Sequence, residues 1–311
     1  MNKMTKLLAL VCAMMMLVAV VAGCSSTGTP AASDAPEATE TPAATDAPAD
    51  ETATADETPA PEESAEATPT LDAIRERGEL ILGTESTYPP FEFIVIENGE
   101  SVGVGMDVAL AQAIADKLGV KLVKSEMAFD SLIPAVQAGT VDIAASITPT
   151  AEREEVVDFS ANYYDTTNCF LVRADEVDSF TAKESFDGKT IGAQQGTAQN
   201  TLLTEEMTNA TSLILPKTST LIQELKTGNI DAICLEKPVA DCYAAAYAGE
   251  LVVCSFEMPV EEGGVAIPVA KGKEDLVAFI NEVIEEMKAN GEMQKIYDEA
   301  VALAIDQIIE D

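Results

Sequence analysis

One arginine lies in the acidic stretch SITPTAEREEVVDFS at residues 146–160. Cations are scarce in this chain, because 54 acidic residues stand against 18 lysines and arginines. One interpretation is that Arg153 pairs only with its acidic neighbours on a solvated helix, but adjacent helical residues do not face one another. A guanidinium presents two parallel N–H donors that match a carboxylate. We therefore predict that Arg153, Ser146 and Thr148 bind a carboxylate, with Thr150 capping the short helix that follows.

The composition excludes several kinds of site. The chain contains no histidine, which excludes histidine-based catalytic triads, imidazole bases and most zinc sites. Its net charge of −36 at pH 7 argues against nucleic acid or anionic lipid as a partner of the folded part. We expect no metal and no cofactor.

The N-terminal region reads as an export signal followed by a tether. Residues 1–23 begin with lysines and continue with an apolar stretch too short to span a membrane, which indicates a signal peptide. Residues 24–70 consist mainly of Ala, Thr, Pro, Ser, Asp and Glu, which predicts a disordered acidic linker. The sequence VAGC resembles a bacterial lipobox, which implies a lipid anchor on Cys24. The alternative is a plain secretory signal.

Four further cysteines lie in the rest of the chain without CxxC spacing: Cys169, Cys234, Cys242 and Cys254. Export permits disulfides and leaves three pairings open, and we expect buried free thiols.

Beyond the linker, segments typical of strands alternate with segments typical of helices. We expect strands at 80–84, 120–129, 141–147, 190–193 and 230–235, and helices at 107–118, 130–139 and 236–247. Gly119 should end the first helix, and Asp130 should cap the second. This alternation predicts an α/β fold with mainly parallel sheets.

Polar clusters follow four of the expected strands. They are TESTY after 80–84, SITPT at 146–150, QQGT after 190–193 and Glu236 after 230–235. Ligands of α/β sheets bind beyond the carboxyl ends of the strands, so the sequence predicts a site where these clusters meet.

Six motifs occur in the order expected for a known family: GTESTYPPFEF (83–93), GMDVALAQAIADKLGV (105–120), FDSLIPAVQAGTVDIAASITPTAEREEVVDFS (129–160), IGAQQGTAQN (191–200), IDAICLEKPVA (230–240) and GGVAIPVAKGKEDLVAFINEVIEEMKANGEMQKIYDEA (263–300). Residues 71–311 thereby resemble the extracellular solute-binding proteins that deliver polar amino acids to ABC importers. The resemblance implies the type II periplasmic-binding-protein fold, with two lobes that each have a mainly parallel central sheet flanked by helices. Two hinge strands join the lobes, of which the first spans 71–165 and 263–311 and the second 166–262.

The resemblance also implies a role for each residue of the site. Arg153, helped by Ser146 and Thr148, receives the carboxylate of the ligand, and Glu236 receives its ammonium group. The residues that enclose the ligand or donate hydrogen bonds from the second lobe are Tyr88, Phe129, Gln194, Thr197 and Gln199.

Two positions depart from the family pattern. Relatives normally have aspartate where this chain has Glu236, and often threonine where it has Ala198. The alternative for Glu236 is a solvated acid paired with Lys237, and the alternative for Phe129 is simple core packing.

Specificity is predicted from Glu85, which lies three residues before Tyr88. Some relatives hold a cationic side chain with an acid at this position. We therefore expect a polar L-amino acid and favour lysine, arginine, ornithine or histidine, with glutamine and cystine as rivals. The alternative for Glu85 is a turn residue exposed to water.

Taken together, the resemblance implies the substrate-binding component of an ABC importer, without enzymatic activity. A bound amino acid would close the two lobes by a hinge motion and be delivered to a permease that works with ATPase subunits. We expect an exported monomer, anchored by the lipid on Cys24 to the outer face of the cytoplasmic membrane. Two alternatives are an enzyme similar to cyclohexadienyl dehydratase on the same fold and the sensing domain of a receptor.

Overall fold

The computed structural model describes residues 68–310. The expected signal peptide, the lipidation site Cys24 and nearly all of the expected linker lie outside the described residues. The first helix, α1 (Pro69–Arg77), starts within the range expected as linker. Its Thr70 is buried and donates its backbone N–H to Asp275, 2.8 Å away, so the folded region already includes the end of that range.

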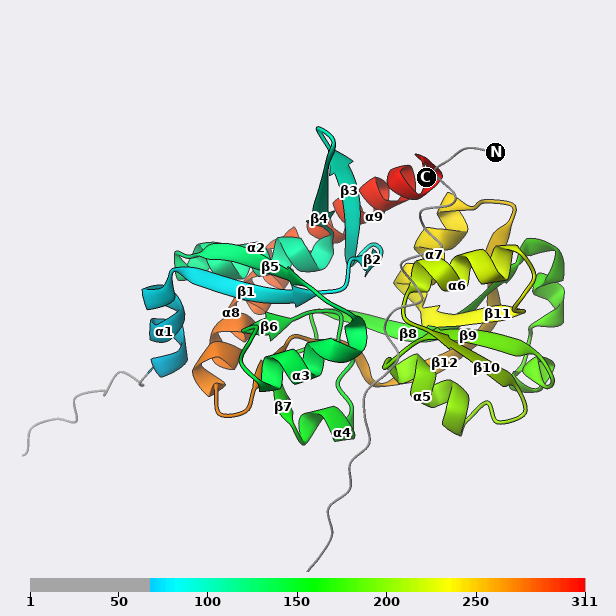
Figure 1. Ribbon diagram of the computed structural model, residues 1–311, viewed down its shortest axis with the longest axis horizontal. Coiled ribbons are helices and arrows are strands. Elements are labelled where there is room, and N and C mark those ends of the chain that lie inside the picture. Colours follow the sequence, from blue (N-terminus) through cyan, green and yellow to red (C-terminus); the bar gives the residue numbers. More distant parts are fainter. Residues whose placement is uncertain (1–67, 311) are drawn as a thin grey trace, which may run out of the picture. The chain divides into compact units, whose positions relative to one another are not determined.

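Five strands form the first sheet, in the order β5-β1-β6-β13-β7 (Figure 1). They are β1 (Glu79–Thr84), β5 (Lys121–Glu126), β6 (Ile143–Ala144), β7 (Val157–Phe159) and β13 (Pro268–Ala270). β1 is parallel to β5 and β6, whereas β13 is antiparallel to its neighbours β6 and β7.

Helices cover both faces of this sheet because successive side chains of a strand point to opposite sides. Leu80 and Leu82 of β1 share a buried cluster with one group of helices, and Ile81 packs on the other face against α3. The helices are α2 (Met106–Leu118), α8 (Glu274–Asn290) and α9 (Glu292–Glu310) in the first group and α3 (Leu132–Gln137) opposite them.

The second sheet also has five strands, in the order β10-β9-β11-β8-β12. They are β8 (Tyr164–Arg173), β9 (Thr190–Gln194), β10 (Thr211–Leu215), β11 (Ala232–Glu236) and β12 (Leu251–Val265). Leu171 and Ile233 are buried with α6 (Thr218–Lys226) and α7 (Lys237–Ala246), whereas Phe170 and Cys234 are buried on the face of α5 (Ala198–Glu205).

The chain passes between the two sheets along β8 and β12, which pair in antiparallel fashion. Gly264 of β12 lies against Asp165 of β8, and a Cβ atom there would lie 2.3 Å from the carbonyl oxygen of Tyr164, so only glycine fits. Two helix-covered sheets joined by two strands confirm the α/β class and the two-lobe architecture (Figure 1). The sheets are mixed and not mainly parallel as expected, because β8, β12 and β13 run antiparallel to their neighbours. We call the part around the first sheet the first lobe and the part around the second sheet the second lobe.

A small sheet of β2 (Thr87–Tyr88), β3 (Glu92–Glu97) and β4 (Glu100–Val104) leads from β1 to α2. The short helix α4 (Ala151–Glu154) follows β6. The four cysteines after residue 165 are buried and free, as expected. Within residues 68–310, no helix is long and apolar enough to cross a membrane.

Several local predictions need correction. The helix expected at 107–118 is α2, and Gly119 ends it with φ 77° as predicted. The strand expected at 120–129 ends at Glu126. The strand expected at 141–147 contracts to β6, since Ser146 adopts φ 53° and turns the chain out of extended geometry. Asp130 does not cap α3; its carboxylate instead accepts a hydrogen bond from Gln195 of the second lobe, at 2.7 Å.

Candidate functional site

One cavity between the lobes gathers nine of the ten residues that were predicted to contact a ligand. It is lined by Tyr88, Phe129, Ser146, Thr148, Arg153, Gln194, Thr197, Ala198, Gln199 and Glu236. Its volume of about 10 Å³ leaves room for roughly one water molecule. The tenth residue, Glu85, lies directly behind the wall and is hydrogen-bonded to Gln194.

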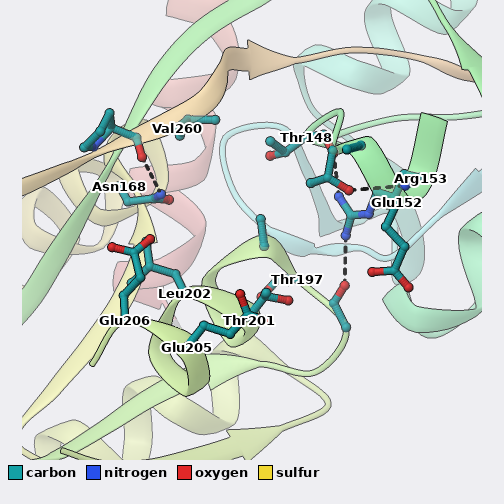
Figure 2. Close-up of a pocket in the computed structure, with 15 residues that line it drawn as sticks. Thr148, Glu152, Arg153, Asn168, Thr197, Thr201, Leu202, Glu205, Glu206 and Val260 are labelled. Carbon is teal, nitrogen blue, oxygen red and sulfur yellow. Dashed lines mark hydrogen bonds between the residues drawn. The ribbon is translucent and has the colours of Figure 1, made fainter. Parts of the chain in front are cut away.

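Arg153 reaches across the crevice from the first lobe (Figure 2). Its Nη1 donates to the carbonyl oxygen of Thr148 at 2.6 Å, and its Nη2 donates to that of Gly196 in the second lobe at 2.9 Å. The guanidinium also lies 5.8 Å from the centre of the Phe129 ring. Burial lowers the pKa of Arg153 to about 10, against a smaller opposing effect of Glu152. The group is a desolvated cation whose donors point at backbone carbonyls.

The turn before Arg153 follows the prediction. Thr150 is the N-cap of α4, and its hydroxyl accepts the backbone N–H of Arg153 at 3.3 Å. This cap fixes the backbone from which the guanidinium extends.

Glu236 approaches the cavity from the end of β11, where it is also the N-cap residue of α7. Its Oε1 accepts a weak hydrogen bond from the Thr148 hydroxyl at 3.3 Å, while Oε2 is buried and has no partner among the described residues. Burial raises the pKa of Glu236 to about 7. The side chain is only 3% exposed, so it is not the solvated acid of the alternative interpretation.

Tyr88 is the last residue of β2 in the first lobe, and Phe129 begins a short 3-10 helix (Phe129–Ser131) in the same lobe. Tyr88 is 7% exposed and its hydroxyl lies 3.5 Å from the backbone nitrogen of Glu236. Phe129 is half-buried and packs partly on the cluster around α3, so it both lines the cavity and contributes to the core.

Gln194 and Glu85 form a buried polar layer behind the cavity. Gln194 Nε2 donates to Glu85 Oε2 and to the carbonyl oxygen of Pro216, both at 3.0 Å. Glu85 also accepts a hydrogen bond from Thr87 at 2.7 Å and is 3% exposed. Burial raises the pKa of Glu85, although both hydrogen bonds oppose the shift. Glu85 is therefore not the exposed turn residue of the alternative interpretation.

Two hydroxyl groups predicted to face a ligand are already engaged. Ser146 Oγ donates to Asp107 at 2.7 Å, and its backbone N–H donates to the Tyr163 hydroxyl at 2.9 Å. Thr197 caps α5 by accepting the N–H of Asn200, and it donates to the carbonyl oxygen of Gln194 at 2.7 Å. These two side chains hydrogen-bond to other parts of the protein and fix the residues that line the cavity.

Gln199 lies in the first turn of α5 and donates from Nε2 to Asn168 Oδ1 at 2.8 Å. Sequence reasoning missed Asn168, Asp107 and Tyr163, as well as the carbonyl group of Gly196. None of them stands out in the sequence, because their importance comes from contacts between segments that are far apart in the chain.

A larger cavity of about 370 Å³ adjoins the first and shares Thr148, Arg153, Thr197 and Ala198 with it. Figure 2 shows residues that line this space, with Thr148 and Arg153 on one side and Asn168 and Leu202 on the other. Three exposed acids lie on its rim: Glu152, Glu205 and Glu206. Its size is that of a typical small-molecule pocket.

Known proteins resemble this chain over most of the described region. Residues 80–301 match the bacterial extracellular solute-binding proteins, family 3. The arginine-binding extracellular protein ArtP of Bacillus subtilis is 35% identical over 225 residues, covering 70% of this chain and 84% of ArtP. The L-cystine-binding protein TcyJ of Escherichia coli K12 is 28% identical over 227 residues, covering 73% and 84%.

Solved structures of amino-acid substrate-binding proteins share this fold. A crystal structure of an amino acid ABC transporter substrate-binding protein from Streptococcus pneumoniae, bound to L-arginine, superimposes with a TM-score of 0.72 at 35% identity. The match covers 75% of this chain and 97% of the other. The family match spans well over half of the 311 residues. The chain therefore belongs to the bacterial extracellular solute-binding proteins of family 3.

Proposed function

We propose that the protein binds a polar L-amino acid in the cavity between its lobes and presents it to an ABC permease. The observation that carries this proposal is the pairing of a half-buried cation, Arg153, with a buried acid, Glu236, in one small cavity. They belong to opposite lobes, and a free amino acid carries the two complementary charges on a carboxylate and an ammonium group bonded to the same carbon atom.

The carboxylate of the ligand is assigned to Arg153. The carbonyl oxygens that now accept its Nη donors are neutral, and a carboxylate accepts hydrogen bonds from a guanidinium more strongly than a neutral carbonyl does. The ammonium group is assigned to Glu236, whose Oε2 lacks a partner within the described part of the chain. A buried acceptor without a partner is costly, and an ammonium donor would relieve that cost.

The side chain of the ligand is assigned to the space beside Gln194 and Glu85. A buried carboxylate at this end favours a cationic side chain, so we favour arginine, lysine, ornithine or histidine over glutamine and cystine. Relatives named as arginine-binding and cystine-binding support this choice of candidates.

Closure is the mechanical part of the proposal. Arg153 contacts the Gly196 carbonyl group and Thr148 contacts Glu236 across the crevice, so these groups meet only when the lobes are together. A ligand that touches both lobes stabilises that state by its extra contacts. A cavity of this size must widen to admit an amino acid, which requires the lobes to separate.

The family is extracellular, so the protein is exported. We further propose that a lipid on Cys24 anchors it to the outer face of the cytoplasmic membrane, that it acts as a monomer and that it has no enzymatic activity. Labelling with a fatty-acid analogue tests the anchor, with Cys24→Ser as the variant that should lose the label.

A thermal-shift screen of the twenty amino acids with ornithine, citrulline and cystine tests the binding function, with isothermal titration of every hit. We expect stabilisation by a cationic amino acid, because a ligand present well above its dissociation constant stabilises the folded state by a few kcal/mol. A response to glutamine alone would overturn the cationic assignment. No response to any of these compounds would overturn the proposed function.

A further inference from the structure

The carboxylate of Asp107 lies at the start of α2, is 1% exposed and faces the cavity wall from behind. Its Oδ2 accepts a hydrogen bond from Ser146 Oγ and its Oδ1 accepts one from Tyr163 Oη, both at 2.7 Å. The Tyr163 hydroxyl in turn accepts the backbone N–H of Ser146 at 2.9 Å. These three bonds close a ring that holds Ser146 by both its side chain and its backbone.

Ser146 needs such support because its backbone is in an uncommon conformation. Its φ of 53° lies in the left-handed region, where residues other than glycine are infrequent. A serine in this position persists only when its surroundings hold it there. The ring of hydrogen bonds through Asp107 and Tyr163 provides this support.

The segment held in this way carries the charged groups of the site. Two residues after Ser146, the carbonyl group of Thr148 accepts the Nη1 donor of Arg153. The hydroxyl of the same threonine donates to Glu236. The residue between Ser146 and Thr148 is Ile147, whose carbonyl oxygen accepts the backbone N–H of Ala266, directly after β12, at 3.0 Å. A shift at Ser146 therefore changes the placement of both charged side chains.

We propose that Asp107 is a positioning residue of the binding site, which acts on the ligand through the left-handed turn at Ser146 without touching the ligand. The expected effect of Asp107 on ligand affinity rests on the proposed function. Its expected effect on the conformation of the turn rests on the structure alone. The conformation of the turn, and not only the stability of the lobe, depends on this carboxylate.

A double-mutant cycle tests the proposal. Glycine adopts a positive φ freely, so Ser146→Gly removes the need for support. We expect Asp107→Ala to weaken binding of L-arginine on the order of tenfold in the parent protein but less than about threefold in the Ser146→Gly background. Equal losses in both backgrounds, or no loss in the parent protein, would overturn the proposal. The isosteric Asp107→Asn serves in the same cycle if the alanine variant does not fold.

A matched control separates positioning from stability. Asp275 is also a carboxylate of the first lobe, and it accepts the backbone N–H groups of Thr70 and Leu71 at the start of α1 instead of holding the turn. Asp275→Ala should lower the melting temperature and leave the affinity for L-arginine within about twofold of the parent value. If Asp275→Ala loses as much affinity as Asp107→Ala, general destabilisation of the lobe is enough to explain the loss, and no positioning role is needed.

Amide hydrogen exchange provides a readout that needs no ligand. In the ligand-free protein, Asp107→Ala should speed exchange in the peptide that contains Ser146, whereas Asp275→Ala should not. Unchanged exchange in Asp107→Ala overturns the positioning role. If the exchange result holds but the parent protein binds no amino acid, the proposed function fails and the structural role of Asp107 stands.

Discussion

At the scale of single residues, Arg153 is the side chain on which the proposed binding depends most. Both of its Nη groups donate into the crevice, and burial has already lowered its pKa to about 10. Removing it leaves the carboxylate of the ligand desolvated and unpaired. We expect Arg153→Ala to weaken amino-acid binding by about 2–4 kcal/mol, and Arg153→Lys to recover only part of that loss, since an ammonium lacks the parallel donors.

Isothermal titration measures this effect. Arg75→Ala is the matched control, because Arg75 is an exposed arginine of the first lobe that pairs with Asp72. Affinity close to the parent value in Arg153→Ala would remove the assigned role.

The second residue-scale prediction concerns the pH dependence that Glu236 confers. Burial raises its pKa to about 7, so the ligand-free protein holds a proton on Glu236 below that pH and loses it above. Binding an ammonium group requires the charged form. Affinity should therefore fall as the pH drops from about 8 to about 6, and binding at pH 7 should release about half a proton per ligand.

The stability of the ligand-free protein should change in the opposite sense. A carboxyl group whose folded pKa exceeds its unfolded value favours folding at low pH and loses that contribution as the pH rises through about 7. Titration calorimetry in buffers of different ionisation enthalpy counts the released protons. Glu236→Gln should abolish the release; an unchanged release in this variant would assign it to another group, such as Asp107, whose pKa burial raises to about 6.

The sequence was enough to predict which residues line the site, but not which hydrogen bonds their side chains form. Nine of the ten predicted side chains line the cavity because the polar clusters do meet beyond the ends of the strands. The hydroxyls of Ser146 and Thr197, however, are engaged by Asp107 and by the first turn of α5. Asp107 cannot be inferred from spacing, because it is a buried acid far away in the sequence. The cap formed by Thr197 has the same three-residue spacing as the cap predicted at Thr150, but it was not predicted.

At the scale of elements, the loop after β9 must approach the first lobe closely when the crevice closes. Gly196 has φ 78°, and a Cβ atom on it would lie 2.8 Å from the Cβ of Asp130 in the opposite lobe. We expect Gly196→Ala to disfavour the closed state and to lower ligand affinity at least about tenfold, because the ligand must then also work against this clash.

The control for this variant is Gly188→Ala in the same lobe. Gly188 has φ 74°, but a Cβ atom added to it would meet nothing within 4 Å, so the variant carries the backbone strain without the interlobe clash. Small-angle scattering with and without ligand reports closure. Equal affinity losses in the two variants would attribute the effect to strain alone.

The elements themselves follow from the sequence where a periodic pattern ends at a glycine. The helix before Gly119 was placed within one residue for this reason. The prediction of a strand over 141–147 was wrong because Ser146 adopts the left-handed conformation, which the hydrophobic alternation of the sequence does not reveal. Aspartate is a residue type that favours N-cap positions, yet the carboxylate of Asp130 accepts a hydrogen bond from Gln195 across the crevice. Both errors arise where tertiary contacts override local preference.

At the scale of the whole molecule, the excess of acid should govern how fast a charged ligand arrives. The chain carries a net charge of −36, and three exposed acids border the larger cavity that leads to the site. A field of one sign along a crevice raises the association rate of a ligand of opposite charge, and salt screens this effect. If the ligand is cationic, its association rate constant should fall about threefold to tenfold between about 10 mM and 500 mM salt.

Stopped-flow fluorescence, with a dye on an exposed position, measures this rate. Replacing the rim acids by Glu205→Gln and Glu206→Gln should slow association at low salt and leave dissociation nearly unchanged, because neither residue contacts the proposed ligand position. The pair Glu97→Gln and Glu100→Gln removes the same charge from the β3–β4 hairpin and should have a smaller effect. Salt-independent association of a cationic ligand, or equal slowing by the two pairs, would mean that the rim does not guide the ligand into the crevice.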